Sequence, residues 1–225
     1  MTDLAANLAR LRARIASACQ HVGRDPSSVR LVAVTKGQPA ALAQAAVDAG
    51  ILDLGENRIQ EALAKIPLVS GARWHLIGHL QRNKVKHLAP FVLIHSVDSV
   101  RLAQALTEQA QALGRSIAVL VQVNVSGESS KFGVSWEEAP DLLGWVRRLE
   151  GLALQGLMTI APLGDAEAAR PYFHRLAQLA RSEGLEELSM GMSGDFAVAI
   201  EEGATVIRVG TALFGARPAT PEPEQ

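Results

Sequence analysis

The sequence predicts a single (β/α)8 barrel of the TIM type with one extra helix at its N-terminus. Short apolar segments alternate with longer stretches rich in Ala, Leu and Glu, and parallel strands need such crossover helices between them. The strand candidates are apolar on nearly every residue, as in IAVLVQVNV (117–125), which is typical of strands covered on both faces. Eight such steps within one domain length favour closure of the sheet into a barrel.

The elements follow one another in a regular order. The chain opens with an amphipathic helix, because apolar residues recur there at helical spacing: Leu4, Leu8, Leu11, Ile15 and Ala18. We then expect eight strands, at 31–35, 51–54, 74–77, 91–95, 117–125, 152–158, 186–189 and 205–209. The helices between them are expected at 39–49, 57–66, 81–89, 98–113, 136–149, 165–183 and 194–202.

The competing arrangement is an open, doubly wound sheet, which the same alternation of strands and helices would also allow. No break in composition indicates a linker, so we expect one domain over residues 1–217. The last residues, within ARPATPEPEQ, are polar and proline-rich, which predicts a disordered tail over 218–225.

Composition excludes several classes of protein. The 225 residues are 48% hydrophobic and 20% charged, with a net charge of −1, so no electrostatic term favours nucleic acid or an anionic membrane as partner. Cys19 is the single cysteine, which excludes an intrachain disulfide and fits a reducing compartment. The N-terminus lacks the apolar core of a secretory signal, and no apolar run has the length of a membrane span. We therefore expect a cytoplasmic protein.

A lysine ends the first predicted strand, directly after the apolar run LVAVT (31–35). Loops at the carboxyl ends of strands carry the chemistry of parallel barrels, so this position matters. One interpretation is that the stem of Lys36 packs on the rim of the barrel and its ammonium group stays in water. The other is a Schiff-base lysine, whose amine becomes nucleophilic when a dry pocket lowers its pKa.

Two glycine-bearing turns after the seventh and eighth strands predict an anion site. SMGMSGD (189–195) places Ser193 and Gly194 where a strand gives way to a helix, and Gly210 and Thr211 do the same in IRVGTALFG (207–215). Backbone N–H groups at such starts bind anions, and barrels of this type commonly bind phosphate after these two strands.

Closure of the barrel would place the first and eighth strands side by side, and with them Lys36 and the phosphate site. A reactive lysine beside a phosphate site suggests pyridoxal phosphate (PLP), or else a phosphorylated sugar held as a Schiff base. Arg208 keeps its charge and can only donate hydrogen bonds, so it could face an unprotonated ring nitrogen. Equally, it could form an ion pair with Glu201 or Glu202 on the preceding helix.

Other polar positions carry weaker signals. His75 and His79 are spaced like a metal pair, but the segment predicts a strand followed by a turn, so a metal site is not expected. Asn57 would lie at the rim beside Lys36, and the polar loop at 127–134 is either a surface turn or a cover over the site.

Long stretches of the chain resemble one known family in order and spacing. They are LVAVTK, LGENRIQEAL, WHLIGHLQRNK, VNVSGESSKFGV, GLMTIAP and LSMGMSGDFAVAIEEGATVIRVGTALFG. The resemblance is to the pyridoxal phosphate homeostasis proteins and covers about residues 28–216. That family is similar to the N-terminal barrel of bacterial alanine racemase.

The resemblance implies a set of cofactor-binding residues. Lys36 would form the covalent aldimine with PLP, Arg208 would face the pyridine nitrogen, and Asn57 would lie by the ring. The phosphate would be held by backbone N–H groups of four further residues: Ser193, Gly194, Gly210 and Thr211.

Three functions follow as hypotheses. The first is a carrier that holds PLP on Lys36 and buffers or delivers it to apo-enzymes without efficient catalysis. The second is an amino-acid racemase with Lys36 as one base and a histidine such as His79 as the other. The third is a Schiff-base aldolase acting on a phosphorylated sugar, which needs no PLP.

The first hypothesis is preferred over an enzyme for two reasons. Strong electron sinks pair the pyridine nitrogen with a carboxylate, and an arginine such as Arg208 weakens the sink, although racemases tolerate that arginine. By resemblance, racemases also take a tyrosine base from a second domain across a dimer, whereas Tyr172 is expected on the outer ring of helices. We therefore expect a non-catalytic protein and a monomer.

Overall fold

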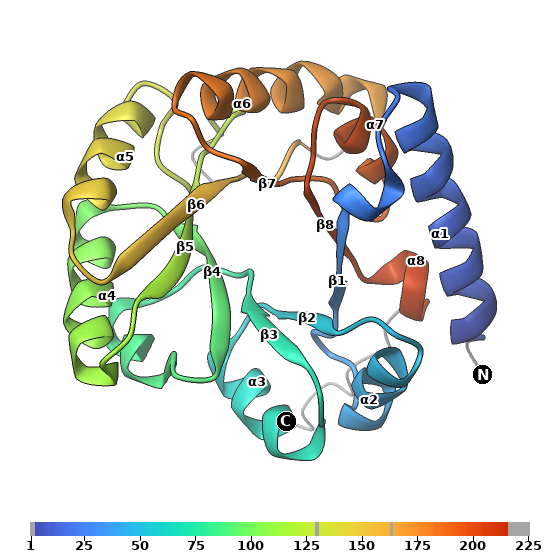
Figure 1. Ribbon diagram of the computed structural model, residues 1–225, viewed down its shortest axis with the longest axis horizontal. Coiled ribbons are helices and arrows are strands. Elements are labelled where there is room, and N and C mark those ends of the chain that lie inside the picture. Colours follow the sequence, from blue (N-terminus) through green and yellow to red (C-terminus); the bar gives the residue numbers. More distant parts are fainter. Residues whose placement is uncertain (1–2, 129–130, 163, 216–225) are drawn as a thin grey trace, which may run out of the picture.

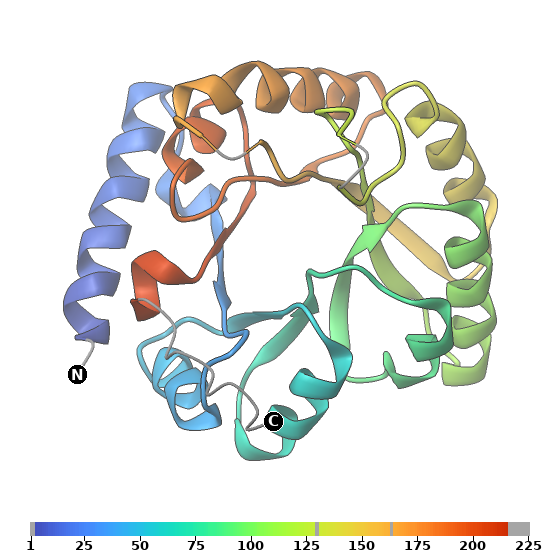
Figure 2. The ribbon, with the colours of Figure 1, turned by 180° about the vertical axis from the view of Figure 1, so that it is seen from behind.

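Eight parallel strands close into a barrel in a computed structural model of the chain, which describes residues 3–128, 131–162 and 164–215 (Figures 1 and 2). The strands are hydrogen-bonded in sequence order, and β1 pairs with β8 to close the sheet. The (β/α)8 prediction is therefore confirmed over the open doubly wound alternative. The strands are β1 (Arg30–Val34), β2 (Asp53–Glu56), β3 (Arg73–Leu76), β4 (Phe91–Val97), β5 (Ile117–Gln122), β6 (Leu152–Met158), β7 (Glu187–Ser189) and β8 (Val206–Val209).

Helices surround the barrel, as the alternating sequence pattern predicts (Figure 1). The α-helices are α1 (Leu4–His21), α2 (Ala40–Asp48), α3 (Ile59–Lys65), α4 (Val100–Leu113), α5 (Ala139–Arg148), α6 (Arg170–Ser182), α7 (Phe196–Glu201) and α8 (Thr211–Phe214). Four short 3-10 helices complete the order: η1 (Pro26–Ser28), η2 (Ile66–Leu68), η3 (Arg82–His87) and η4 (Glu167–Ala169).

Three predicted elements differ from the structure. The helix expected at 81–89 is the 3-10 helix η3. The strand expected at 117–125 ends at Gln122, after which Val123 makes only an isolated bridge to Val134. The strand expected at 51–54 is displaced to 53–56, where the backbone pairs with β3 as far as Glu56, whose carboxylate is fully buried against Lys65. A search for apolar residues does not recognise a buried charged residue as part of a strand when its partner lies outside that strand.

The extra N-terminal helix lies outside the ring, against α7 and α8 (Figures 1 and 2). Asp3 caps it by accepting a hydrogen bond from the Ala6 N–H. Its predicted apolar stripe is buried at Leu8, Leu11 and Ile15. The helix therefore covers the side of the barrel where β8 joins β1.

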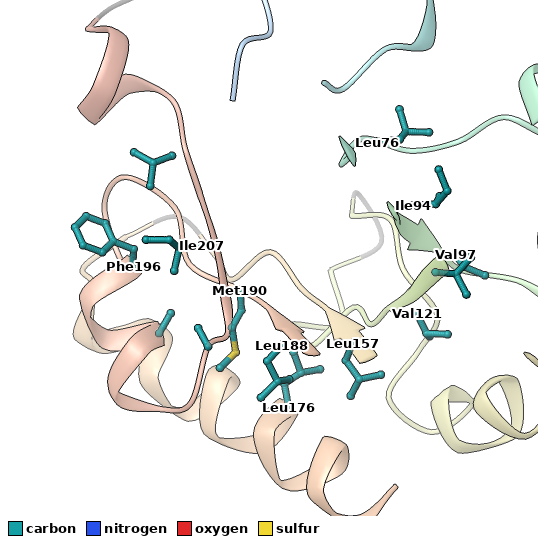
Figure 3. Close-up of a cluster of buried hydrophobic side chains, with 14 of the residues drawn as sticks. Leu76, Ile94, Val97, Val121, Leu157, Leu176, Leu188, Met190, Phe196 and Ile207 are labelled. Atoms are coloured by element: carbon teal, nitrogen blue, oxygen red, sulfur yellow. The ribbon is translucent and has the colours of Figure 1, made fainter. Parts of the chain in front are cut away.

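The main hydrophobic core lies between the strands and the helices (Figure 3). Ile94, Val121 and Leu157 project from the outer face of the barrel, and Leu176 of α6 packs with them in the same cluster. The alternate residues on those strands form a separate small cluster of Leu93, Leu120 and Met158. Because successive side chains on a strand point to opposite faces, this second cluster lies inside the barrel.

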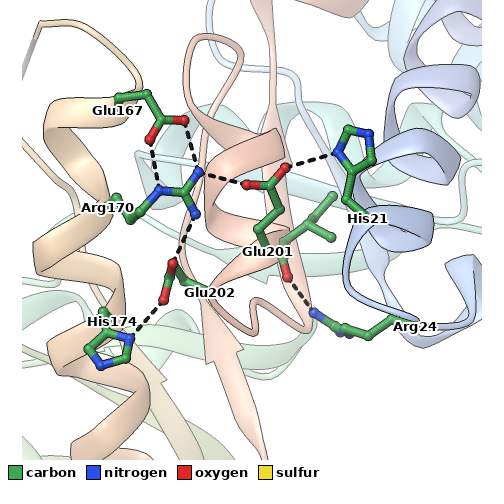
Figure 4. A network of polar contacts seen from close by, with 8 residues as sticks. His21, Arg24, Glu167, Arg170, His174, Glu201 and Glu202 are labelled. Atoms are coloured by element: carbon green, nitrogen blue, oxygen red, sulfur yellow. Dashed lines mark hydrogen bonds and ion pairs between the residues drawn. The ribbon is translucent and has the colours of Figure 1, made fainter.

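On the outside of the barrel, Arg170 of α6 connects α6 to α7 through a network of charged side chains (Figure 4). The network contains His21, Glu167, Arg170, His174, Glu201 and Glu202. Arg170 Nη2 lies 2.7 Å from Glu201 Oε2, and its Nη1 lies 2.9 Å from Glu202 Oε1. Burial disfavours the charge on Glu202, but hydrogen bonds from Arg170 and His174 outweigh it, so the pKa of Glu202 is lowered.

We expect Arg170→Gln to lower the free energy of unfolding by about 1 kcal/mol at pH 7, a modest value because the guanidinium is about one-third exposed. A lowered carboxyl pKa contributes stability above the unfolded pKa and loses it as the pH falls through the folded pKa. The difference from wild type should therefore vanish in acid, as measured by urea unfolding at several pH values. Arg181→Gln, on the exposed side of the same helix, should cost less; an equal loss at every pH would contradict the prediction.

Two further expectations concern the C-terminal tail and membrane-spanning helices. The tail predicted to be disordered, 218–225, lies outside the described residues. Among the residues that the structure does describe, no helix has both the length and the apolarity needed to cross a membrane.

Candidate functional site

Lys36 lies just beyond β1, where the barrel closes. Val32 and Ala33 of β1 pair with Arg208 and Val209 of β8, so the loops after the two strands leave the barrel together. At Gly210 an added Cβ would meet the Val34 carbonyl oxygen at 3.3 Å. The predicted adjacency of Lys36 and the start of α8 is therefore present in the fold.

The loops after β7 and β8 also contact each other. The Ser193 hydroxyl accepts a hydrogen bond of 3.2 Å from the Ala212 N–H, which ties the β7 loop to the first turn of α8. Within the described part of the chain, the backbone N–H groups of Ser193, Gly194, Gly210 and Thr211 donate to no protein acceptor. Four unused donors on two joined loops can bind an anion such as a phosphate group.

Arg208 is buried inside the barrel, with 4% of its surface exposed. Its Nη1 donates to the Ser189 hydroxyl at 2.7 Å, and its Nη2 donates to the Thr159 carbonyl oxygen at 2.8 Å. Burial lowers the pKa of Arg208 to about 10, and the negative charge of Asp195 opposes that shift. The guanidinium therefore stays charged at neutral pH, with donors left for a ligand.

The alternative ion pair of Arg208 with Glu201 or Glu202 is wrong. Both carboxylates bind Arg170 on the outside of the barrel, whereas Arg208 points to its interior. Residues on α7 and β8 that are close in sequence thus face different environments. The sequence analysis missed Ser189 and Thr159 as partners, because they lie 19 and 49 residues away along the chain.

Asn57 follows β2 and borders a pocket of about 480 Å³. An added Cβ at Gly78 would meet the Asn57 carbonyl oxygen at 2.3 Å, so only glycine allows the β2 and β3 loops to approach so closely. Arg58, Lys84 and Phe132 also line this pocket. Of the predicted site residues, Asn57 alone belongs to its wall, and the other six surround the ends of β1, β7 and β8.

His79 lines the same pocket, apart from the loops after β7 and β8. Its Nδ1 lies 3.3 Å from Asp98 Oδ2, and its ring stacks on Phe132 with 3.9 Å between centroids. His75, by contrast, points into the barrel and contacts His95. The two histidines therefore lie in different environments, as expected for a strand followed by a turn.

A buried cluster clamps the backbone on both sides of Lys36. Lys65 Nζ donates to the Thr35 carbonyl oxygen at 2.6 Å, and to Glu56 Oε1 and Glu61 Oε1 at 2.7 Å each. Glu61 also accepts a hydrogen bond from the N–H of Gly37. One ammonium group thus fixes Thr35 directly and Gly37 through Glu61.

Burial sets the electrostatics of this clamp. Glu56 is fully buried, and burial raises its pKa despite opposing hydrogen bonds from Lys65 and Thr35. Glu56 Oε2 has no protein hydrogen-bond partner among the described residues. The sequence analysis missed the clamp, because Lys65 in the last turn of a short helix is also what the helix dipole favours.

Comparison with known proteins identifies the family of the chain. The model of the family "Alanine racemase, N-terminal domain" matches residues 6–218. A pyridoxal phosphate homeostasis protein of Pseudomonas aeruginosa is 47% identical over 96% of this chain and 97% of its own length. Its Escherichia coli K12 counterpart is 40% identical over 96% of this chain and 98% of its own.

A solved structure extends the comparison to three dimensions. PipY of Synechococcus elongatus, in a structure with PLP bound, is 39% identical with a TM-score of 0.78, and the match covers 95% of this chain and all of that one. By sequence and by fold, the chain belongs to the pyridoxal phosphate homeostasis protein family, which carries the alanine racemase N-terminal domain.

Proposed function

We propose that this protein binds PLP covalently through Lys36 and buffers or delivers it without efficient catalysis. The observation that carries the proposal is the meeting of three features at one end of the barrel. They are the lysine after β1, the four unused N–H donors after β7 and β8, and the buried guanidinium of Arg208. Each feature suits one part of PLP: the aldehyde, the phosphate and the ring nitrogen.

The loops fit a phosphate group in both space and charge. An added Cβ at Gly194 would meet no atom within 4 Å, so the space beside this N–H is open. Ser193 and Thr211 add hydroxyl groups to the N–H donors, and hydroxyl groups hydrogen-bond phosphate oxygens well. Ser193, Gly194, Gly210 and Thr211 would hold the phosphate.

The chemistry of the cofactor assigns the other residues. PLP supplies an aldehyde carbon that condenses with a primary amine and releases one water. Lys36 supplies that amine, and the clamp formed by Lys65 holds the peptide on both sides of it. Asn57, on the next loop, would lie beside the ring.

Arg208 supports a carrier rather than an enzyme that needs a strong electron sink. Because guanidinium can only donate, it leaves the ring nitrogen unprotonated and so limits the ring's capacity to accept electrons. Among the described residues, no carboxylate forms an ion pair with Arg208, so none is placed beside it to pair with the ring nitrogen instead. The relatives are named pyridoxal phosphate homeostasis proteins, which supports the same role.

The reactivity of PLP suggests what such a protein would do in the cell. A free aldehyde reacts with many amines, so a protein that holds it covalently can protect and supply it. The recipients would be PLP-dependent apo-enzymes in the cytoplasm, and we propose that the protein acts as a monomer. No part of the proposal involves nucleic acid or a membrane.

The first test is a titration of the purified protein with PLP, followed by visible absorption, borohydride reduction and peptide mass spectrometry. We expect a yellow protein with the reduced pyridoxyl group on the peptide that contains Lys36. A protein that takes up no PLP would overturn the proposal and would favour the aldolase on a phosphorylated sugar.

A second test separates the carrier from the racemase. The loaded protein is incubated with amino acids in deuterated water, and exchange of the α-proton is followed by NMR. We expect no exchange above that of free PLP. Rapid exchange that His79→Asn abolishes would establish the racemase instead.

A further inference from the structure

A continuous row of buried polar side chains crosses the inside of the barrel and ends at Arg208. Ser189 Oγ lies 2.7 Å from Arg208 Nη1 and 2.8 Å from His95 Nδ1. His95 Nε2 lies 3.0 Å from His75 Nδ1, and His75 Nε2 lies 2.8 Å from Asp53 Oδ1. None of the five residues is more than 6% exposed.

This row begins at the amino-terminal end of the barrel and runs toward its carboxyl-terminal end. Asp53 is the first residue of β2, whereas Arg208 is the third of the four residues of β8. The bond between His95 on β4 and Ser189 on β7 spans the interior, because these strands are not neighbours in the sheet. The row therefore links the amino-terminal end to Arg208 through the interior of the barrel, beside the small apolar cluster there.

Hydrogen-bond chemistry assigns a direction to every bond in the row. Guanidinium can only donate, so Ser189 Oγ accepts from Arg208. Among the described residues, the remaining partner for the buried Ser189 hydroxyl hydrogen is His95 Nδ1, which must then be unprotonated. A neutral His95 carries its proton on Nε2 and donates to His75 Nδ1, and His75 Nε2 in turn donates to Asp53.

The charges at the two ends agree with this direction. Burial, with the charges of Arg208 and Arg30 acting in the same direction, holds the pKa of His95 well below the usual histidine range, so the ring is neutral. Burial disfavours the charge of Asp53, but hydrogen bonds from His75 and Arg73 outweigh it and lower its pKa. A cation at one end and an anion at the other polarise the neutral groups between them in the same sense.

We infer that Asp53, His75, His95 and Ser189 form a polarised relay that positions Arg208 and couples the amino-terminal end of the barrel to the cofactor site. This inference rests on the proposed function, because Arg208 is the residue assigned to the PLP ring. The members of the relay are positioning residues, since they act through Arg208. The far end reaches solvent through Arg73, which binds Asp53 and whose side chain is 55% exposed.

The first experiment measures the protons of the relay directly. Long-range 1H–15N NMR of the wild-type protein without PLP reports the tautomer of each imidazole. We expect the Nε2–H tautomer for both His75 and His95 across neutral pH. An Nδ1–H tautomer or an imidazolium at either ring would overturn the assigned direction, and this measurement requires no substitution.

The second experiment tests coupling over distance with PLP as the probe. We expect Ser189→Ala and Asp53→Asn each to raise the dissociation constant of PLP about three- to tenfold, the range that one lost hydrogen bond gives. Glu187→Gln is the matched control, because Glu187 binds Arg30 at the same end of the barrel but takes no part in the relay. The dissociation constant of PLP for Glu187→Gln should stay within about twofold of the wild-type value, because no hydrogen bond of the relay is lost.

The outcomes separate the inference from the proposed function. If Asp53→Asn binds PLP as tightly as wild type, while its circular dichroism shows a folded protein, the coupling is refuted even if Ser189→Ala binds weakly. If the wild type binds no PLP, the proposed function fails, and the NMR tautomers still decide whether the relay has the assigned direction.

Discussion

Lys36→Ala is expected to abolish the adduct that borohydride traps, while the variant keeps a weaker affinity for PLP that depends on its phosphate group. The loss is complete because no other residue in the proposed site carries a primary amine. The residual affinity is expected because the N–H donors of the β7 and β8 loops belong to the backbone and are unaffected by the substitution. Absorption spectra and mass spectrometry measure the first effect.

Competition separates the two contributions to binding. Lys36→Ala should lose its remaining PLP when inorganic phosphate is added, and it should bind pyridoxal, which lacks the phosphate, more weakly than it binds PLP. Lys84→Ala is the control, because Lys84 lines the pocket beside Asn57 and is not assigned to the covalent bond. Retention of the trapped adduct by Lys36→Ala, or its loss in Lys84→Ala, would place the covalent bond elsewhere.

The fold could be predicted from the sequence because the evidence for it is local and repeated. Each strand of a parallel barrel is covered on both faces, so a run such as LVAVT is apolar throughout. β2 is one exception, because it ends in the buried Glu56. The ammonium group that pairs with Glu56 belongs to Lys65 in the following helix, so the pattern of the strand alone does not reveal it.

Two residues of the candidate site could also be predicted from the local sequence. Charged residues that end or interrupt apolar strands stand out, as Lys36 and Arg208 do. Their partners do not stand out, because contacts across the barrel join residues far apart in sequence: His95 and Ser189 are separated by 94 positions. Strand spacing predicts which loops meet, but it does not predict which interior side chains form hydrogen bonds with one another.

The interior of the barrel and the clamp beside Lys36 each contain a buried cation, and the two cations are stabilised differently. A buried charge is costly unless it is paired and hydrogen-bonded. Arg208 is separated from the carboxylate of Asp53 by three neutral groups, which leaves donors for a ligand. Lys65 instead contacts two carboxylates directly and uses its three donors within the protein. The first arrangement suits binding, and the second suits rigidity.

The rigid arrangement leads to the largest expected effect on stability. We expect Lys65→Met, which nearly preserves the shape of the side chain, to lower the free energy of unfolding by about 3–5 kcal/mol at neutral pH, as when one partner of a buried ion pair is removed. Glu56 would then be a buried carboxylate whose remaining hydrogen-bond partner among the described residues is the Thr35 hydroxyl. Urea unfolding measures the loss, and Lys86→Met, at an exposed lysine, should change stability little.

The pH dependence identifies the carboxylate responsible. The pKa of Glu56 is raised by burial in the wild type, and removal of Lys65 takes away an opposing interaction and raises it further. A raised carboxyl pKa contributes stability that is present below the unfolded value and is lost as the pH rises through the folded value. Lys65→Met should therefore be less destabilised at pH 5 than at pH 8.

A second substitution tests whether charge is the cause. Glu56→Gln combined with Lys65→Met removes the buried charge, so the double variant should be more stable than Lys65→Met alone at pH 8 and should show little difference between the two pH values. A double variant that is no more stable, together with a loss independent of pH, would mean that Lys65 acts through packing. Because Lys65 and Glu61 hold Thr35 and Gly37, the folded fraction of Lys65→Met should also form the trapped adduct more slowly than wild type.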